Sequence, residues 1–145
     1  MKEDTHTEAE IGQTRRKREA IGIDFDGVIH AYSQGWCTGV IYDIPVAGAQ
    51  EALTLLSRRF RIVIYSARSY DHPEKGQHGK GQKEDMELWL SRYSIPYDEI
   101  HTAPGKPDCE VFIDDKGYRF EGDWVKTRKD IERLSSRKWA TGGDS

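Results

Sequence analysis

The sequence predicts an α/β protein in which helices cover both faces of a doubly wound, mainly parallel β-sheet, giving three layers. Short apolar runs that are typical of strands alternate with longer stretches that have helical spacing of apolar residues. The strand runs are apolar throughout instead of alternating, which favours a parallel sheet buried on both faces. In such a sheet the carboxyl ends of the strands meet at one edge, and ligands bind there.

The expected elements follow one another along the chain. Strands are expected at residues 21–25, 62–65, 97–102 and 111–113. Helices are expected at residues 45–59, 83–93 and 124–138. Asp123 is a plausible N-cap for the last helix, and Leu88 is expected to join Met86, Trp89 and Leu90 in apolar contacts. The segment 32–42 is expected to form a turn and a short hairpin, and 69–82 a loop.

Length and composition limit the classes of protein. The chain has 145 residues, enough for one domain, expected at residues 20–139 between flexible ends at 1–19 and 140–145. The net charge of −3 gives no general reason to expect nucleic-acid or membrane binding. No apolar run approaches the roughly 20 residues that span a bilayer, and the N-terminus lacks an apolar signal core. We therefore expect a cytoplasmic protein in which both cysteines are free thiols.

Two carboxylates end the first expected strand. The apolar run Ile21–Ile23 leads into Asp24, Asp26 follows two positions on, and Gly27 ends the run. Unpaired buried charge is costly, so a divalent cation at the carboxyl end of this strand would stabilise the pair. With an ordinary pKa of about 3.9, Asp24 is expected to be ionised at neutral pH and able to attack a phosphoryl group. The alternative is that the two residues only cap a turn.

Another acidic pair, Asp114 and Asp115, closes the last expected strand. Adjacent carboxylates raise each other's pKa unless a cation lies between them. Mg²⁺ fits this environment because it accepts few carboxylates, keeps several waters and bridges to phosphate. The alternative, a turn or helix cap, accounts for one of the pair more readily than for both.

Phosphate-binding groups are expected on the remaining strand end and the loop before the last strand. The hydroxyl of Ser66 and neighbouring backbone N–H groups can bind phosphoryl oxygens, and Arg68 adds a planar donor. Lys106 can keep Asp24 ionised and neutralise the transferred group. The alternatives are a turn residue for Ser66 and surface charges for Arg68 and Lys106.

The ordered set resembles the haloacid dehalogenase superfamily of phosphohydrolases. The motifs of that family appear as DFDGV at 24–28, Ser66, Lys106 and Asp114-Asp115, and the resemblance covers most of residues 20–121. It implies a Rossmann-like fold in which Asp24 is the nucleophile and Asp26 the general acid and base. It also implies that Ser66 and Lys106 bind phosphate. The implied Mg²⁺ ligands are Asp24, Asp26 through its backbone carbonyl, Asp115 directly and Asp114 in an assisting role.

A narrower resemblance concerns the substrate. Ser66-Ala67-Arg68 together with FIDDK at 112–116 resembles the phosphatase half of phage polynucleotide kinases, which implies that Ser66, Ala67, Arg68 and Lys106 bind the substrate phosphate. Only about 20 residues separate Asp26 from the first helix, too few for a folded cap domain. The family pattern then implies a capless, open site that takes large substrates or gains a lid from a partner subunit, so a homo-oligomer is one expectation.

The expected function is Mg²⁺-dependent hydrolysis of a phosphomonoester through an aspartyl-phosphate, acting on a nucleotide or a polynucleotide phosphate end. Tyr32, Trp36 and Tyr70 can stack on a nucleobase, although packing explains them equally well. Three alternatives stay open. They are a phosphatase for small phosphorylated metabolites, a non-catalytic phosphoryl-binding domain, and a doubly wound domain that only binds a partner.

Overall fold

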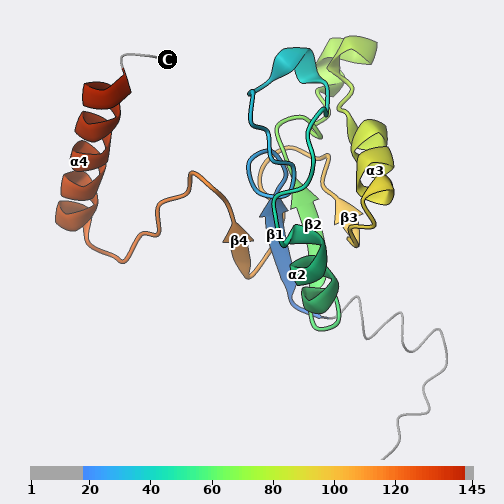
Figure 1. Cartoon of the computed structure of the whole chain (residues 1–145), viewed down its shortest axis with the longest axis horizontal. Helices are drawn as coiled ribbons and strands as arrows, with labels where there is room; N and C mark the ends of the chain where they lie inside the picture. The colour runs from blue at the N-terminus through green and yellow to red at the C-terminus, as the bar shows by residue number, and fades with distance from the viewer. Residues whose placement is uncertain (1–17, 143–145) are drawn as a thin grey trace, which may run out of the picture. The chain divides into compact units, whose positions relative to one another are not determined.

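A four-stranded, all-parallel sheet is the centre of the fold (Figure 1). The computed structural model describes residues 18–142, with the backbone alone for 78 and 135–142. The strand order is β3-β2-β1-β4. The strands are β1 (Ala20–Asp24), β2 (Arg61–Tyr65), β3 (Glu99–Ile100) and β4 (Val111–Ile113). The predicted α/β class with a parallel sheet is therefore confirmed.

The strand register brings together the chain ends that carry polar residues. Asp24 on β1 pairs with Tyr65, the last residue of β2. On its other side β1 pairs with β4, and Ile23 lies opposite Ile113. One residue beyond that pair, Asp24 and Asp114 leave the sheet side by side. Because all these strands are parallel, their carboxyl ends form one edge.

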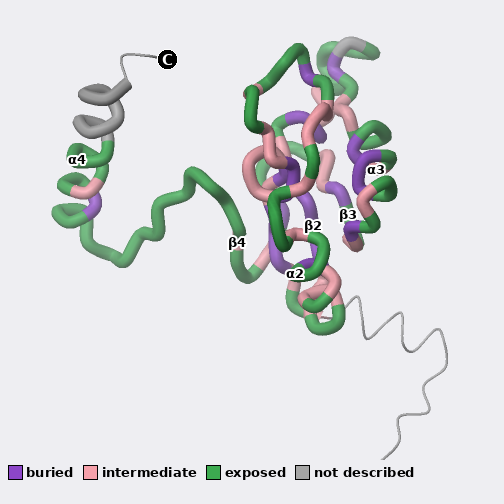
Figure 2. The backbone as a smooth tube through the Cα atoms, viewed as in Figure 1, coloured by how far each residue is buried: buried purple, intermediate pink, exposed green. Residues whose placement is uncertain are grey.

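Helices α2 (Ala49–Leu56) and α3 (Lys83–Arg92) contribute to a single apolar core with β1 and β2. Alternate residues of the two strands supply it, in the register-matched pairs Ile21–Ile62 and Ile23–Ile64. The helices add Leu53, Met86, Trp89 and Leu90. Figure 2 shows β1 and β2 as the buried centre of this unit. The core therefore fixes the two strands whose ends carry Asp24 and Ser66.

The helix expected at 45–59 is shorter than predicted. Gly48 has a left-handed backbone (φ 86°), which interrupts helical geometry, so α2 begins at Ala49. The prediction for Leu88 was also wrong, since its side chain is 71% exposed. Met86, Trp89 and Leu90 occupy one face of α3 at spacings of three and four residues, and Leu88 lies outside that face.

The two connecting segments also differ from expectation. In the described chain, residues 32–42 form no hairpin; they contain a 3₁₀ helix at Cys37–Gly39 and an isolated bridge joins His30 to Pro45. Left-handed backbone at Tyr32, Cys37 and Thr38 prevents two straight strands there. The segment expected as plain loop contains a second 3₁₀ helix, Pro73–Gly79.

Strand β4 lies where it was predicted but is not buried. Val111 is 47% exposed and Ile113 39% exposed. As an edge strand, β4 pairs only with β1 and therefore lacks a neighbouring strand on its outer side. The continuous apolar run was consistent with a buried strand, but an edge position leaves part of such a run accessible.

The contacts divide the chain into two units between Asp115 and Lys116, and each is described by itself. The second unit contains α4 (Trp124–Gly142), which extends past residue 138. The Lys126 N–H donates to Asp123 Oδ1 at 3.1 Å, so the predicted N-cap is confirmed. The single domain expected over residues 20–139 stays a prediction, and the expected flexible ends fall mainly outside the described residues.

Two further expectations concern chemistry and the membrane. Cys37 and Cys109 are both free thiols, as predicted. Among the helices of the described residues, none combines the length and the apolar character that a membrane crossing requires.

Candidate functional site

Three carboxylates meet at the carboxyl edge of the sheet. Asp24 ends β1, and Asp114 and Asp115 directly follow β4. One oxygen from each lies within 4.8 Å of the others, and we call these residues the acidic group. Asp24 is half-buried, whereas Asp114 and Asp115 are exposed. The structure thus brings together three of the four residues predicted as metal ligands.

Gly27 makes room for the acidic group. Its backbone is left-handed (φ 85°), and a Cβ atom added there would collide with Oδ2 of Asp115. The turn is closed by the Gly27 N–H, which donates to the His30 carbonyl at 2.8 Å. Glycine is therefore required twice at this position, for the backbone angle and for the approach of Asp115.

The electrostatics of the acidic group are unfavourable without a cation. The pKa of Asp24 is raised from 3.8 to about 6, mainly by burial; a hydrogen bond from the Phe25 N–H opposes the rise, and the charges of Asp114, Asp115 and Asp26 add to it. That bond is 2.8 Å long and fixes Oδ1 of Asp24. The ordinary pKa assumed from the sequence was therefore too low, because half-burial and like charges both favour the protonated form.

The donor set of the acidic group fits a hard divalent cation. All three side chains offer carboxylate oxygen, the ligand type that Mg²⁺ and Ca²⁺ prefer. Ligand atoms of an octahedral Mg²⁺ lie about 3–4 Å apart, which is within the 4.8 Å limit of the group. A cation there would also offset the repulsion that raises the pKa of Asp24.

Tyr65 adjoins the acidic group and was not identified from the sequence. Its hydroxyl donates to Asp114 Oδ2 at 3.3 Å, and its ring packs edge-on against Phe112 with centroids 5.4 Å apart. Burial raises its pKa, and the charges of Asp114 and Asp24 raise it further. The available signal was its position, at the end of a strand and directly before Ser66.

The side chain of Asp26 is turned away from the acidic group towards Arg68. The guanidinium donates from Nε to Asp26 Oδ2 and from Nη2 to Asp26 Oδ1, both at 2.9 Å. Arg68 is only 3% exposed, whereas the Asp26 side chain is 17% exposed, so the guanidinium is shielded from water and part of the carboxylate stays accessible. In the structure a carboxylate occupies two nitrogens of Arg68, and its donation to a substrate phosphate stays a prediction. The side chain of Asp26 is not part of the acidic group.

His30 is the second partner of Asp26 and was also missed. Its Nε2 accepts the backbone N–H of Asp43 at 3.0 Å, so the proton of the neutral ring is on Nδ1. Nδ1 then donates to Asp26 Oδ1 at 2.9 Å. The ring is fully buried. Its spacing four residues after Asp26 was the only sequence signal, and such a spacing alone is weak.

Arg68 also connects the surrounding segments to Asp26. Its Nη1 donates to the Gly39 carbonyl at 2.7 Å and to Gln82 Oε1 at 2.9 Å. Its guanidinium carbon lies 4.8 Å from the centre of the Trp36 ring. The segment 36–39, the residue before α3 and the loop after β1 are thus joined through one side chain, which gives Trp36 a packing role.

Three of the four predicted phosphate-binding residues line one pocket. Ser66, Ala67 and Lys106 border a cavity of about 360 Å³ together with Tyr65, Tyr70, His72, His101, Ala103 and Gly105. We call it the Ser66–Lys106 pocket. Lys106 Nζ lies 4.9 Å from the centre of the Phe112 ring. The expected contact between Lys106 and Asp24 stays a prediction.

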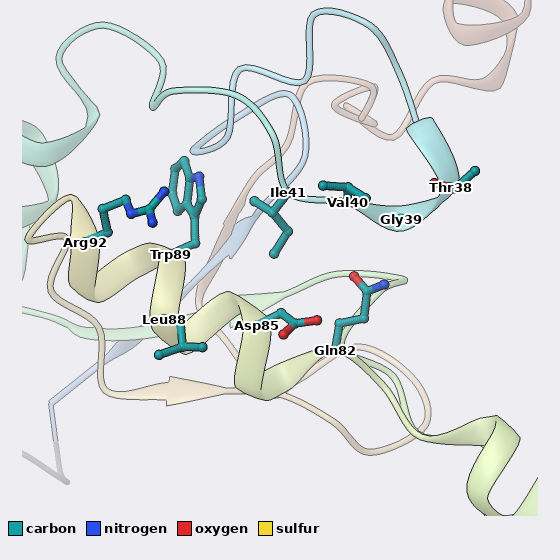
Figure 3. A pocket seen from close by; sticks show the side chains of 9 residues that line it. All are labelled: Thr38, Gly39, Val40, Ile41, Gln82, Asp85, Leu88, Trp89 and Arg92. Carbon is teal, nitrogen blue, oxygen red and sulfur yellow. The ribbon is translucent and has the colours of Figure 1, made fainter.

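A larger cavity of about 490 Å³ lies between α3 and the segment 38–41 (Figure 3). Asp85, Leu88, Trp89 and Arg92 of α3 line one side, and Ile41 lines the other. None of the predicted site residues lines it, so it is separate from the acidic group. Its connection to Asp26 is indirect, through Gln82, which both lines the cavity and accepts from Arg68.

Comparisons with known proteins give little further information. No family model and no curated protein matches the chain. Among solved structures, the crystal structure of an MCSG target from Vibrio cholerae is 24% identical with a TM-score of 0.47. The match covers 80% of this chain and 98% of that chain. A similarity of this size does not identify a family.

Replacing Arg68 with Met should destabilise the protein strongly. It leaves the Asp26 carboxylate without its bidentate partner, and breaking a buried pair in this way costs about 3–5 kcal/mol. Arg61→Met is the matched control, since Arg61 makes a two-nitrogen pair with Glu99 at 2.9 Å that is 30% and 46% exposed. The control should cost less than about 1 kcal/mol. Urea unfolding measures both; equal losses would show that the Asp26–Arg68 pair has no special role.

The raised pKa of Asp24 predicts a pH-dependent stability. The pKa is 3.8 ordinarily and about 6 in the folded protein, so the folded state binds more protons between these values. The contribution of Asp24 is therefore most favourable below about pH 4 and is lost as the pH rises through about 6. In chelator, Asp24→Asn should remove this dependence and raise the Tm at pH 7.5 by a few degrees. Parallel stability curves for the two proteins between pH 4 and 7 would contradict the assignment.

Proposed function

We propose that this chain is a Mg²⁺-dependent phosphomonoester hydrolase of the haloacid dehalogenase type, working through an aspartyl-phosphate. The observation that carries the proposal is the acidic group, in which a half-buried carboxylate from one strand lies within 4.8 Å of two carboxylates from another. Retaining three acidic side chains at such a distance costs stability unless a cation is bound. The order of the motifs along the chain supports the same family.

Asp24 is the proposed nucleophile. One of its carboxylate oxygens attacks phosphorus, a new O–P bond forms, and the ester O–P bond breaks with its electron pair on the leaving oxygen. Asp26 gives that oxygen a proton. Water then attacks the phosphorus of the aspartyl-phosphate and gives its proton to the Asp26 carboxylate, which releases inorganic phosphate and regenerates Asp24.

Arg68 and His30 support the role of Asp26 by fixing its position. Three charge-assisted hydrogen bonds, two from Arg68 and one from His30, orient its two oxygens. Because both partners are buried, this orientation is set before substrate binds.

The residues that would hold Mg²⁺ are the acidic group and the backbone carbonyl of Asp26. When bound, the cation would neutralise negative charge on the phosphoryl oxygens. Ser66, the N–H of Ala67 and Lys106, which line the Ser66–Lys106 pocket, would bind those oxygens.

The proposed arrangement is a three-layer, Rossmann-like fold without a cap domain. Among the described residues, the connection from β1 to α2 contains only one short 3₁₀ helix, and so does that from β2 to α3. Neither forms a folded domain over the sheet edge, which supports an open site. Such a site would admit a phosphorylated small molecule, a nucleotide or a nucleic-acid end, and a partner subunit in a homo-oligomer would complete its wall.

Hydrolysis of an aryl phosphate, with and without Mg²⁺, tests the proposal. The unmodified chain should release phosphate only with the cation, and Asp24→Asn should reduce kcat by at least about 10³-fold because the nucleophile is lost. Asp85→Asn is the control, since Asp85 is an exposed carboxylate on α3 outside the acidic group. Near-normal turnover by Asp24→Asn would refute the nucleophile. Absence of Mg²⁺-dependent hydrolysis across nucleotides, sugar phosphates and 3′-phosphorylated oligonucleotides would refute the enzyme.

Gly27→Ala should weaken Mg²⁺ binding, because the new Cβ displaces Asp115. Gly48→Ala is a close control: the two glycines have φ angles of 85° and 86°, but a Cβ at Gly48 meets nothing within 4 Å. Both variants should lose stability from backbone strain, by about 1 kcal/mol. Only Gly27→Ala should lose the rise in Tm that Mg²⁺ gives, by at least about half. Equal Mg²⁺ responses would show that Asp115 is not a ligand.

A further inference from the structure

The Ser66–Lys106 pocket and the acidic group share one neighbour, Tyr65. Tyr65 forms part of its wall, and the hydroxyl of the same residue donates to Asp114 at 3.3 Å. Ser66 follows Tyr65 at the end of β2, and Lys106 comes from the loop after β3. A phosphate held between Ser66 and Lys106 would therefore lie beside Tyr65, the residue whose hydroxyl contacts the acidic group.

Four of the residues that line the pocket carry aromatic rings: Tyr65, Tyr70, His72 and His101. Tyr70 and His72 pack edge-to-face with centroids only 4.3 Å apart, so each restricts the other. Tyr65 is restricted in the same way by Phe112. Rings fixed before binding offer flat apolar surface at little cost in conformational entropy. A planar aromatic group is the ligand that such surfaces bind best.

The two histidines in the wall have defined tautomers when neutral. His72 Nδ1 lies 3.2 Å from Glu74 Oε1, and His101 Nε2 lies 2.9 Å from the Gly105 carbonyl. Both partners accept hydrogen bonds, so these ring nitrogens donate. The other nitrogen of each ring, Nε2 of His72 and Nδ1 of His101, is then an acceptor. Acceptors beside flat rings suit the N–H groups of a heterocycle.

The charge and the volume of the pocket limit the class of ligand further. Among the described residues that line the pocket, Lys106 is the one permanent cation and none is acidic, which suits a single anionic group. The volume of about 360 Å³ is at the lower end of the range of about 300–1,000 Å³ for small-molecule sites. It accommodates one nucleoside and not a run of several nucleotides. The net charge of −3 also argues against tracking a polynucleotide backbone.

We propose that the Ser66–Lys106 pocket binds the nucleoside part of a nucleoside monophosphate, with the base against Tyr70 and His72 and the phosphate between Ser66 and Lys106. The pocket is thereby the site that selects the substrate. Its role in hydrolysis rests on the function proposed above, whereas nucleotide binding does not.

Calorimetric titration of the full-length Asp24→Asn variant in saturating Mg²⁺ tests the pocket without turnover. Adenosine 5′-monophosphate should bind at least about tenfold more tightly than ribose 5-phosphate, which lacks only the base. Adding Tyr70→Ala should reduce this ratio to about threefold or less, and Tyr70→Phe should retain it because the ring remains. Leu88→Ala, an exposed position outside this pocket, should leave it unchanged. If Tyr70→Ala does not fold, His72→Ala and the ligand comparison alone provide the test.

Equal affinity for the two ligands would overturn the proposal. So would tighter binding, by more than tenfold, of a 3′-phosphorylated octanucleotide than of the mononucleotide, because the pocket would then not define the ligand. Hydrolysis assays separate the two proposals. If nucleotide binding depends on the base but the unmodified chain hydrolyses nothing, the pocket proposal stands and the phosphatase proposal is refuted. If the chain hydrolyses aryl phosphate but binding does not depend on the base, the phosphatase proposal stands and the pocket proposal is refuted.

Discussion

Repulsion between like charges is the constraint on which the functional edge of this molecule depends. The parallel pairing of β1 with β4 brings Asp24 beside Asp114, and the left-handed turn at Gly27 lets Asp115 approach as well. The fold thus places three carboxylates within 4.8 Å of one another. Burial and these neighbours raise the pKa of Asp24 to about 6, which is the energetic cost of the arrangement. The cation that we propose for this edge would replace that repulsion with attraction.

The fourth carboxylate, Asp26, adds to this repulsion but has hydrogen-bonding partners of its own. Asp26 is two residues from Asp24, yet its oxygens face Arg68 and His30. The two residues of the DFD segment therefore lie in different electrostatic environments, one dominated by like charge and the other by hydrogen-bond donors. Such a difference is what distinct roles in phosphoryl transfer require, since a nucleophile and a proton carrier need different properties. Arg68 extends the second environment to the segment 36–39 and to α3.

Much of this arrangement could be predicted from sequence because it depends on strand ends. The apolar runs before Asp24, Ser66 and Asp114 indicated strands, and parallel pairing then implied one shared edge, so the acidic group was expected. The pairing of Arg68 with Asp26 was not predicted, because the two residues are 42 positions apart in the chain and only the folded turn brings them together. The exposure of Val111 and Ile113 also depends on strand order, which a run of apolar residues does not encode. Positive φ angles at Tyr32, Cys37 and Thr38 explain why residues 32–42 form no hairpin. These residue types rarely adopt such angles, so the sequence did not indicate them.

Anomalous diffraction from crystals of the full chain grown with Mn²⁺, which takes the same oxygen ligands as Mg²⁺, tests the central claim most directly. We expect a single strong peak bounded by Asp24, Asp114 and Asp115, with carboxylate oxygens of Asp24 and Asp115 both coordinated to the ion. Crystals of Asp24→Asn should lose or weaken that peak. A map without a peak at this edge, or with Asp24 and Asp115 too far apart to coordinate one ion, would contradict the account.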